Sequence, residues 1–518
     1  MSNTVQTGLF DLIKSLSGSE KRYFKLFAAK HETGQSALYI LLFDLIEEQA
    51  VYDEETLLGK EKSIKKGSIS SLKNYLYDFI LKSLEVFHKE NSINSKISEM
   101  ILQAEILFNK GLYQQCKKIL VRAKSIALNH EKLQSILDII DWQTVVANAE
   151  MDIPSFETNI KKLSAEKKEV LQQLALINEC ENLKSELSYR FVSQTKSVNP
   201  DELKSFVALI KKYNDPGILK TLPFNARYFL ALSEILYHTL THEPQKASAS
   251  AQKMVSLLET KPQLIVDEPK RYIGQLMNQI KALIEAGELR SLPKALEKLK
   301  TSEEKFQAIN KSAHMKANIF YSYYAGQLNL NAALGYFSKN VALVQEIEDG
   351  LKIYSEKLSL QKITDIRFNI AYSYFGNKEY KLSLKWASKI INESNQQSLG
   401  TLYFITKIFI LFLHYELENT LLIAPGIRSI QRQYSLHEKN YAIVPKLLSL
   451  LKKLSDLTTK SDKKELCNFY LKEIKNNAPS IFQQQLLEWF DFESWIKSKI
   501  ENLDFPDVIK EQAKTRYK

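Results

Sequence analysis

The sequence predicts an all-α fold built from antiparallel helix pairs, and three observations support this prediction. Glycine and proline are scarce: 15 glycines and 12 prolines make up about 5 % of the 518 residues, against about 12 % in an average protein. Apolar residues recur at the helical spacing of 3.6 residues along almost the whole chain, and no long segment alternates as a half-buried strand does. Few chain breakers favour long helices with short connections and count against sandwiches, barrels and nucleotide-binding sheets.

The composition is that of a folded protein. Apolar residues make up 44 % and charged residues 25 % of the chain, which are ordinary globular values. The most apolar stretch, residues 401–418, is interrupted by Lys407 and predicts a buried helix rather than a membrane span. The first twenty residues contain Asp11 and no basic start, so no secretory signal is expected. Three widely spaced cysteines imply no disulfide framework. We expect a cytoplasmic protein without membrane insertion.

Three regions are expected along the chain. Residues 1–91 form a small helical bundle, residues 92–480 form a series of helix pairs, and residues 481–518 form a C-terminal capping helix and tail. Within the bundle, Ser17 or Ser19 is expected to cap the second helix, and Glu20 places an acidic side chain near its N-terminus. The helices expected in the bundle span residues 5–16, 19–29, 36–49, 53–58 and 70–89.

Two helix pairs, at residues 97–130 and 364–397, place small residues between large ones on both helices. Small residues allow two helices to approach closely, and large neighbours fill the space beside them. This pattern resembles the tetratricopeptide repeat (TPR), a helix–turn–helix unit, in a divergent α-solenoid of the bacterial cytoplasmic type. Weaker similarity occurs at residues 280–299 and 414–433. The small residues are Ala104, Cys116, Ala371 and Ser383, and the large ones are Leu107, Leu120, Tyr374 and Tyr380.

The two units depart from the repeat at several positions. Met100 and Gln103 stand where the repeat prefers Trp and Leu, and neither unit has the closing proline. In the second unit Ala387 takes a usually large position and Ile390 a usually small one. The resemblance implies a TPR-like solenoid: a right-handed superhelical array of antiparallel helix pairs with a concave face.

The same resemblance implies a function. It predicts a non-enzymatic scaffold or adaptor that binds a protein or peptide segment on the concave face. Carried over by position, the ligand-facing residues of the clearest unit are Asp365, Phe368, Asn369 and Tyr372. Asn369 would hold a peptide backbone amide, while Phe368 and Tyr372 would offer apolar contact.

Residues 368–391 carry six aromatic rings, which could bind a ligand or fill the contact between two helices. Phe368, Tyr372 and Phe375 recur at spacings of four and three, as residues on one helical face do. Tyr374, Tyr380 and Trp386 fall where the repeat packs helix on helix. Aromatic residues at helical spacing usually form core, so we expect most of these rings to pack within the protein.

The sequence contains no motif of a known catalytic or cofactor site. Phosphate-binding glycine loops, a GxSxG elbow, CxxC pairs and HExxH are all missing, so neither enzymatic activity nor a cofactor is expected. Glu234, His238 and His242 recur every four residues and form a weak candidate metal set, with a polar helix face as the favoured alternative. Cys180, beside two acids, is expected to be an inert buried thiol.

The net charge of +11 is located mainly in the C-terminal half. Residues 1–150 carry 19 basic and 19 acidic side chains, whereas residues 251–500 carry 35 basic and 25 acidic ones. A diffuse positive field can favour RNA, and interleaved tyrosines can stack on bases. An RNA- or ribosome-associated factor is therefore an alternative function, although a solvated lysine-rich surface explains the same excess.

A second alternative is DNA binding by the N-terminal bundle. The expected helices at 53–58 and 70–89 are loosely similar to a helix-turn-helix pair. The region is electrically neutral, and the second helix carries enough apolar residues to bury most of its surface. DNA is therefore an unfavoured partner. We prefer the alternative that the bundle is an N-terminal cap for the array of helix pairs. The basic side chains available to DNA are those of Lys60, Lys62, Lys65 and Lys66.

The segment 484–503 predicts a closing helix. Leu487, Phe490 and Ile496 are expected to cover the last helix pair. Trp489 and Trp495 are large for a free surface, so an oligomer contact is considered there. The side chains expected to face water are those of Glu488, Asp491 and Glu493.

Overall fold

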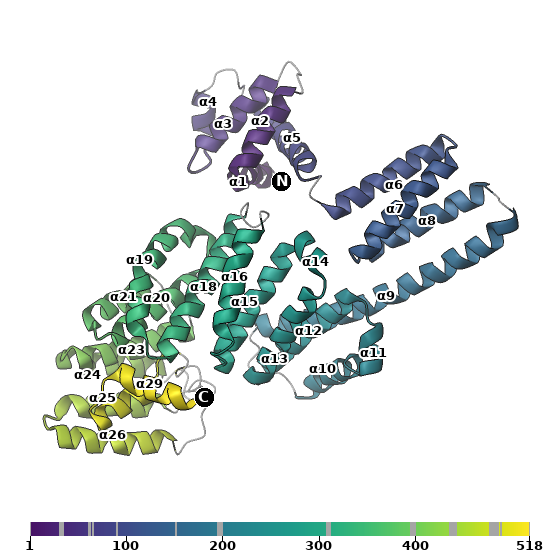
Figure 1. Ribbon diagram of the computed structural model, residues 1–518. Helices are drawn as coiled ribbons and strands as arrows, with labels where there is room; N and C mark the ends of the chain where they lie inside the picture. Colours follow the sequence, from purple (N-terminus) through teal and green to yellow (C-terminus); the bar gives the residue numbers. More distant parts are fainter. Residues whose placement is uncertain are drawn as a thin grey trace. The chain divides into compact units, whose positions relative to one another are not determined.

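The chain is helical throughout the part that the structure describes (Figure 1). A computed structural model describes residues 2–30, 36–60, 64, 67–89, 92–150, 153–193, 200–306, 312–393, 400–434, 443–475, 486 and 489–516. No strand occurs among these residues, and the all-α prediction is confirmed. The chain divides into two compact units, residues 1–183 with 211–230 and residues 184–210 with 231–518.

The first five helices enclose a hydrophobic core of their own. Phe24 and Phe43 are fully buried, with ring centroids 4.7 Å apart. Ser17 and Glu20 form the expected cap: the Ser17 amide donates to the Glu20 carboxylate at 2.7 Å, and the Glu20 amide donates to Ser17 Oγ at 3.3 Å. All five helices lie within three residues of the predicted ranges. They are α1 (Ser2–Ser15), α2 (Gly18–Lys30), α3 (Ser36–Glu48), α4 (Glu54–Lys60) and α5 (Ile69–Lys89).

The next helices begin with the first predicted repeat. Ala104 and Cys116 are fully buried where α6 packs on α7, as their small size predicts. Gly111 has φ +73° in the turn between them, a conformation that glycine adopts without strain. Helix α8 packs on α7 and on α6. The helices are α6 (Ile93–Asn109), α7 (Tyr113–Asn129), α8 (Leu133–Glu150) and the long α9 (Ile153–Ser193).

Most helices of the next region begin with a proline. Proline suits the first helical turn because its fixed φ is helical and its missing N–H would be unpaired there anyway. These starts allow the short connections that the composition predicts. The helices of this region are α10 (Pro200–Tyr213), α11 (Pro216–Thr221), α12 (Phe224–Leu240), α13 (Pro244–Glu259), α14 (Pro262–Asp267), α15 (Pro269–Ala286) and α16 (Leu292–Lys305).

From α18 to α26, each described helix packs on the next one in the series (Figure 1). In addition, α18 contacts α20, α20 contacts α23, and α23 contacts α25, so alternate helices also touch. Two short helices, α28 and α29, follow and pack on each other. The bounds are α18 (Ala313–Ala333), α19 (Phe337–Tyr354), η1 (Ser355–Lys357), α20 (Leu360–Gly376), α21 (Tyr380–Glu393), α23 (Thr401–Glu416), α24 (Thr420–Tyr434), α25 (Val444–Asp456), α26 (Lys460–Lys475), α28 (Phe492–Glu501) and α29 (Phe505–Arg516).

The second predicted repeat is formed by α20 and α21. Ala371 and Ser383 are fully buried between the two helices, and the Ser383 hydroxyl donates a 2.6 Å hydrogen bond to the Ala371 carbonyl. Asn340 of α19 donates to the Leu328 carbonyl at 2.8 Å and to Ser373 Oγ at 3.0 Å. This buried side chain ties α18, α19 and α20 together, because leaving its amide unpaired would be costly.

The six rings of residues 368–391 pack within the protein, as predicted. Phe368 and Phe375 are fully or almost fully buried, and Tyr372 and Trp386 are less than a tenth exposed. Tyr374 and Tyr380 are partly buried against the same core. The predicted buried helix of residues 401–418 is α23, which carries nine buried side chains.

Alanine at Gly376 is expected to destabilise the C-terminal unit. A Cβ added at Gly376 would overlap the ring of Phe337, and overpacking of this kind costs about 1–3 kcal/mol. Urea unfolding followed by tryptophan fluorescence measures the effect, since Trp386, Trp489 and Trp495 belong to this core. Gly274→Ala in α15 is the control: an added Cβ meets no atom within 4 Å, and alanine should be neutral or stabilising by up to about 1 kcal/mol. Equal stabilities for the two variants would contradict this packing.

Candidate functional site

The four predicted ligand-facing residues all lie on α20, and three of them are buried. Phe368 is fully buried and Tyr372 is 9 % exposed. Asn369 is equally buried, and its carboxamide donates to Asp365 Oδ1 at 2.8 Å. The Asp365 residue keeps a small exposed area, although protein atoms surround its carboxyl group. A partner role for Asp365 stays a prediction, whereas Phe368, Asn369 and Tyr372 are not exposed to a partner on this surface.

The C-terminal segment of the same chain covers Phe368 and Tyr372. The Trp489 ring lies 5.3 Å from Phe368 in an edge-on arrangement, as measured between centroids. Phe490 and Phe505 lie 5.9 Å and 6.2 Å from Tyr372. Edge-to-face contacts at these distances are favourable beyond the area they bury. Phe368 and Tyr372, which were expected to contact a ligand, are therefore contacted by aromatic side chains of the chain's own C-terminal segment.

The predictions for the closing helix have mixed outcomes. Phe490 and Ile496 are buried as expected, whereas Leu487 and Glu488 lie outside the described residues. The expectation of an oligomer contact at Trp495 is wrong. This ring is 1 % exposed, and its indole N–H donates to the Glu416 carboxylate.

The remaining members of that segment have local roles. Asp491 caps α28 by accepting a 2.9 Å hydrogen bond from the Ser494 amide, and Glu493 lies in the first turn of that helix. Trp489 is partly buried against Phe368. The segment packs on α26, the last helix before it, and also reaches α18. It covers more of the array than the last helix pair alone.

Asp365 lies in a polar cluster contributed by α15, α18 and α20. Burial raises the pKa of Asp365 to about 6, although hydrogen bonds from Tyr321 and Asn369 and the charge of Lys281 oppose the rise. The ammonium group of Lys362 donates to the Asn318 side chain, and burial lowers the pKa of this lysine. A carboxyl group with a raised pKa is a common property of binding sites, but buried structural groups show it too.

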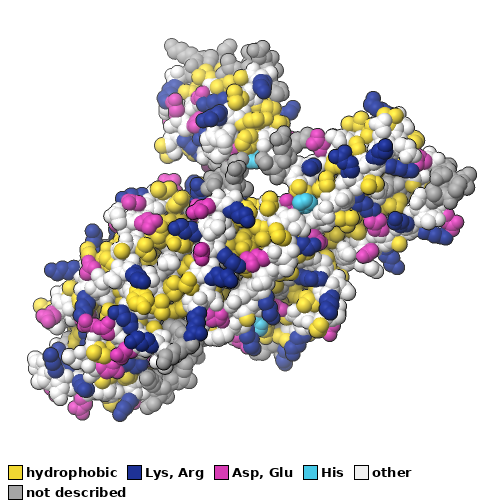
Figure 2. Space-filling view, viewed as in Figure 1, with side chains coloured by type: hydrophobic (Ala, Val, Ile, Leu, Met, Phe, Trp, Pro, Cys, Tyr) yellow, Lys and Arg dark blue, Asp and Glu magenta, His cyan; other side chains and the backbone are white. Residues whose placement is uncertain are grey.

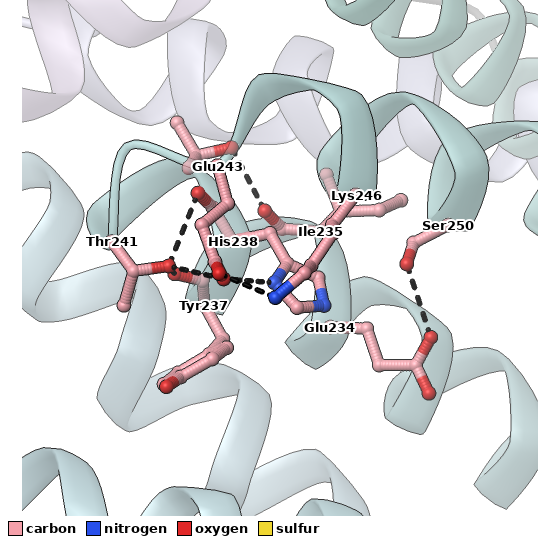
Figure 3. A network of polar contacts seen from close by, with 9 residues as sticks. Glu234, Ile235, Tyr237, His238, Thr241, Glu243, Lys246 and Ser250 are labelled. Carbon is pink, nitrogen blue, oxygen red and sulfur yellow. Dashed lines mark hydrogen bonds and ion pairs between the residues drawn. The ribbon is translucent and has the colours of Figure 1, made fainter.

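The candidate metal set is not brought together by the structure. Helix α12 ends at Leu240, and His242 has φ +56° in the turn, so it leaves the helical face of Glu234 and His238. The Glu234 carboxylate accepts a 3.2 Å hydrogen bond from Ser250 Oγ (Figure 3). In the part of the chain that the structure describes, no group of three His, Cys, Asp or Glu side chains is arranged to hold a metal ion.

Glu243, which the sequence analysis did not single out, is the centre of this polar network (Figure 3). Its carboxylate accepts from Lys246, from His238 at 2.9 Å and from Thr241 at 3.0 Å. These contacts, with Lys246 first, lower the pKa of Glu243 to about 2. The network joins the end of α12 to the start of α13 and acts as a structural turn. Of the three metal candidates, only His238 takes part in this network, and Glu234 bonds to Ser250 instead.

An open groove between α6 and α8 was not identified from the sequence. It has a volume of about 390 Å³, within the range of small binding sites. Helical spacing places one row of residues on each helix, but their adjacency depends on the packing of α6 beside α8. The lining residues are Ser98, Ile101, Asp138, Asp141, Trp142 and Val145.

A second groove, of about 470 Å³, lies along α14, α15 and α16. Three lysines of one face of α16, Lys294, Lys298 and Lys305, line it. Lys298 donates to Glu259 Oε1 at 2.6 Å, and Tyr272 donates to the same oxygen at 2.8 Å. Burial opposes ionisation of Glu259, but these two partners outweigh it and lower the pKa of that carboxyl.

Basic side chains are interspersed with acidic ones elsewhere. On the face drawn in Figure 2, Lys and Arg lie among Asp, Glu and apolar side chains rather than in one continuous stripe. In the N-terminal bundle, Lys60 pairs with Glu48 at 3.6 Å, whereas Lys62, Lys65 and Lys66 lie outside the described residues. The helix proposed to enter DNA, α5, buries Lys73 against Glu54.

The three cysteines are free thiols and all are buried. Burial, with a smaller effect of Glu179, raises the pKa of Cys180 to about 11. At neutral pH this thiol is therefore protonated, which agrees with the prediction that it is inert.

No protein-family model matches this chain, and comparison with curated proteins and with solved structures also found no match. None of the helices in the described residues has both the length and the hydropathy needed to cross a membrane. The class of protein that the structure defines is thus an all-α protein of consecutively packed helices.

Asp365→Asn is expected to stabilise the protein at neutral pH. Because folding raises the pKa of Asp365 above its usual value near 4, ionisation opposes folding, and stability falls as pH rises from about 4 to about 6. Asparagine removes the charge and keeps one acceptor oxygen for Tyr321, but it loses the hydrogen bond that Asn369 donates to the other oxygen. The gain at pH 7.5 should be on the order of 2 kcal/mol and should disappear below pH 4. Urea unfolding at several pH values measures it.

Asp349→Asn is the control for that pH profile. Lys352 and Gln345 lower the pKa of Asp349, so its removal should have the opposite sign: a small loss of stability at neutral pH. If Asp365→Asn shows no gain that depends on pH, the buried-carboxyl interpretation is incorrect.

Phe490→Ala is expected to loosen the C-terminal segment. Removing a fully buried Phe costs about 3–5 kcal/mol. Limited proteolysis should then cleave near residues 489–516 at lower protease concentration. Phe469→Ala in α26 is the control, because Phe469 is 56 % exposed and its truncation should change stability by less than about 0.5 kcal/mol. Unchanged cleavage of the Phe490 variant would show that the segment is not held by this ring.

Proposed function

We propose that this protein is a TPR-like helical-repeat scaffold, without enzymatic activity, that binds a segment of another protein. Two features support the repeat interpretation. Successive helices pack on each other and alternate helices touch, both in α6–α8 and in α18–α25. Small residues occupy the close contacts at Ala104, Cys116, Ala371 and Ser383. Helix pairs with two apolar sides need neighbours on both sides, so such chains form extended arrays with long binding surfaces.

The observation that carries the binding proposal is the groove between α6 and α8. In the TPR-like arrangement, the first helices of consecutive units line the concave face, and α6 and α8 hold those positions. The groove combines apolar surface from Ile101, Trp142 and Val145 with carboxylates from Asp138 and Asp141. Apolar lining with a few polar groups is typical of a surface that binds a peptide helix or strand.

The face of α20 and α23 that carries Phe368 is a poorer candidate for the binding surface. It is covered by the chain's own aromatic residues 489, 490 and 505. Binding through this face would require that segment to leave, at the cost of exposing several buried rings. The α6–α8 groove needs no such rearrangement.

A second candidate function is RNA association through the basic C-terminal half. The groove lined by Lys294, Lys298 and Lys305 favours it, because lysines on one helical face can follow a phosphate backbone. Such binding would weaken steeply with salt, since it is driven by counterion release, whereas an apolar groove is less sensitive to salt.

Affinity capture of the tagged protein from its own host tests the proposal. We expect a protein partner that persists at high salt and after nuclease treatment. Val145→Gln should reduce its recovery about tenfold, because a buried apolar contact worth about 1.4 kcal/mol would be lost. The matched control is Val121→Gln on α7: Val121 is 60 % exposed and does not line the groove, so recovery should be unchanged.

One result would contradict the scaffold proposal, and another would contradict its assignment to the α6–α8 groove. Recovery of RNA or ribosomal material that nuclease removes would support the second candidate function instead. Equal recovery of a protein partner by wild type, Val145→Gln and Val121→Gln would place the binding surface away from this groove.

A further inference from the structure

Charge is segregated between the helices that form the α6–α8 groove. Helix α7, which packs behind the two lining helices, contains four basic residues and no acidic one. Helix α8 contains three acidic residues and no basic one. Helix α6 contains two acidic residues and one lysine. The acidic residues are Glu99, Glu105, Asp138, Asp141 and Glu150, and the basic residues of α7 are Lys117, Lys118, Arg122 and Lys124.

Two of the four cations of α7 bond to side chains outside the groove. Lys117 pairs with Glu150, and Lys124 contacts Gln143 at 3.0 Å and Glu166 at 2.7 Å. None of these three acceptors lines the groove. Neither of these two lysines therefore pairs with a groove carboxylate.

The groove itself keeps an uncompensated acidic character. Asp141 pairs with Lys167 of α9, yet its side chain remains 55 % exposed. Asp138 is exposed and has no ion pair or hydrogen bond of its side chain within the described residues. The lining set contains no basic residue. A ligand in this groove thus meets two carboxylates, only one of which has a cationic partner.

The apolar lining is held in place from behind. The Trp142 ring packs edge-on against Phe108, with centroids 5.8 Å apart, and Phe108 packs on Tyr113 at 5.4 Å. Val145 is 42 % exposed one turn further along α8. A supported tryptophan beside an exposed valine offers a fixed apolar surface, which is the kind of feature that anchors a large side chain of a partner.

We propose that the α6–α8 groove binds a cationic amphipathic helix of a partner protein. Its lysine or arginine side chains would face Asp138 and Asp141, and its apolar side would lie on Ile101, Trp142 and Val145. An amphipathic helix in an apolar groove is a common mode of recognition, and charge complementarity sets its specificity and association rate. This proposal rests on the scaffold function above and specifies the chemical class of the partner.

Fluorescence anisotropy with two labelled model helices tests the partner class on the full-length protein. Both helices carry leucine on one face; one carries lysine on the other face, and its counterpart carries glutamate there. We expect the lysine helix to bind wild type at least about tenfold more tightly than the glutamate helix. Asp138→Lys should remove most of that preference, and added salt should reduce it.

Glu169→Lys is the matched control for charge. Glu169 is exposed on α9, has no described partner and does not line the groove, and the substitution changes the net charge by the same amount. Its affinity for the lysine helix should change less than about twofold. Equal losses in Asp138→Lys and Glu169→Lys would show a general field effect and overturn the proposal, as would equal binding of the two helices by wild type.

Val145→Gln separates this proposal from the scaffold function. If Val145→Gln reduces capture of the host partner while Asp138→Lys leaves it unchanged, the groove binds protein but the cationic class is wrong. If Val145→Gln changes neither capture nor binding of the lysine helix, the groove is not the binding surface. This proposal then fails, while the scaffold function stands with a binding surface elsewhere on the chain. We expect Val145→Gln and Asp138→Lys each to reduce both capture of the host partner and binding of the lysine helix.

Discussion

Phe490 lies among four aromatic rings of α20 and α23, with centroid distances of 5.9 Å to Tyr372, 5.3 Å to Phe375, 5.2 Å to Phe409 and 4.8 Å to Phe412. This cluster joins the C-terminal segment to two helices that precede it by some 80 to 120 residues. Because aromatic burial dominates the energy of such a contact, the segment is part of the hydrophobic core. The surface that this contact covers is the one that the repeat resemblance assigns to a ligand, so this face is not open to a partner.

The close packing of the array depends on small and polar residues at the helix contacts. The Ser383 hydroxyl donates a hydrogen bond to the Ala371 carbonyl. The Asn340 side chain donates to the Leu328 carbonyl and to the Ser373 hydroxyl. Each of these bonds needs one relative position of the helices, because an unpaired buried polar group costs more than the bond contributes. Apolar burial provides the stability of the array, and these polar contacts select one register.

The two open grooves differ in charge. Asp138 and Asp141 line the groove of α6 and α8, whereas Lys294, Lys298 and Lys305 line the groove of α14 to α16. Glu259, which accepts a hydrogen bond from Lys298, and Glu297 also line the second groove and offset part of its positive charge. A net charge of +11 therefore hides two local surfaces of opposite sign, and the partner preferred by each depends on its own lining rather than on the total.

Local chemistry determined much of this protein. The scarcity of glycine and proline, the helical spacing of apolar residues and the Ser17–Glu20 capping box are properties of short segments, and the helices follow them. The burial of Ala104, Cys116, Ala371 and Ser383 was predictable for the same reason, since each stands at a fixed helical position beside larger neighbours. Helical spacing and the repeat pattern also predicted that most rings of residues 368–391 pack within the protein, although Phe368 and Tyr372 were assigned to a ligand as well.

Contacts between distant segments were decided only by the tertiary structure. Periodicity shows that Phe368 and Tyr372 share a helical face, but not that residues 489, 490 and 505 would cover it. The spacing of Glu234, His238 and His242 assumes a continuous helix, and the chain turns after Leu240 instead. The α6–α8 groove arises because two helices separated by α7 lie side by side. Spacing along one helix determines which residues share a face, whereas the neighbour of that face depends on the packing of the whole chain.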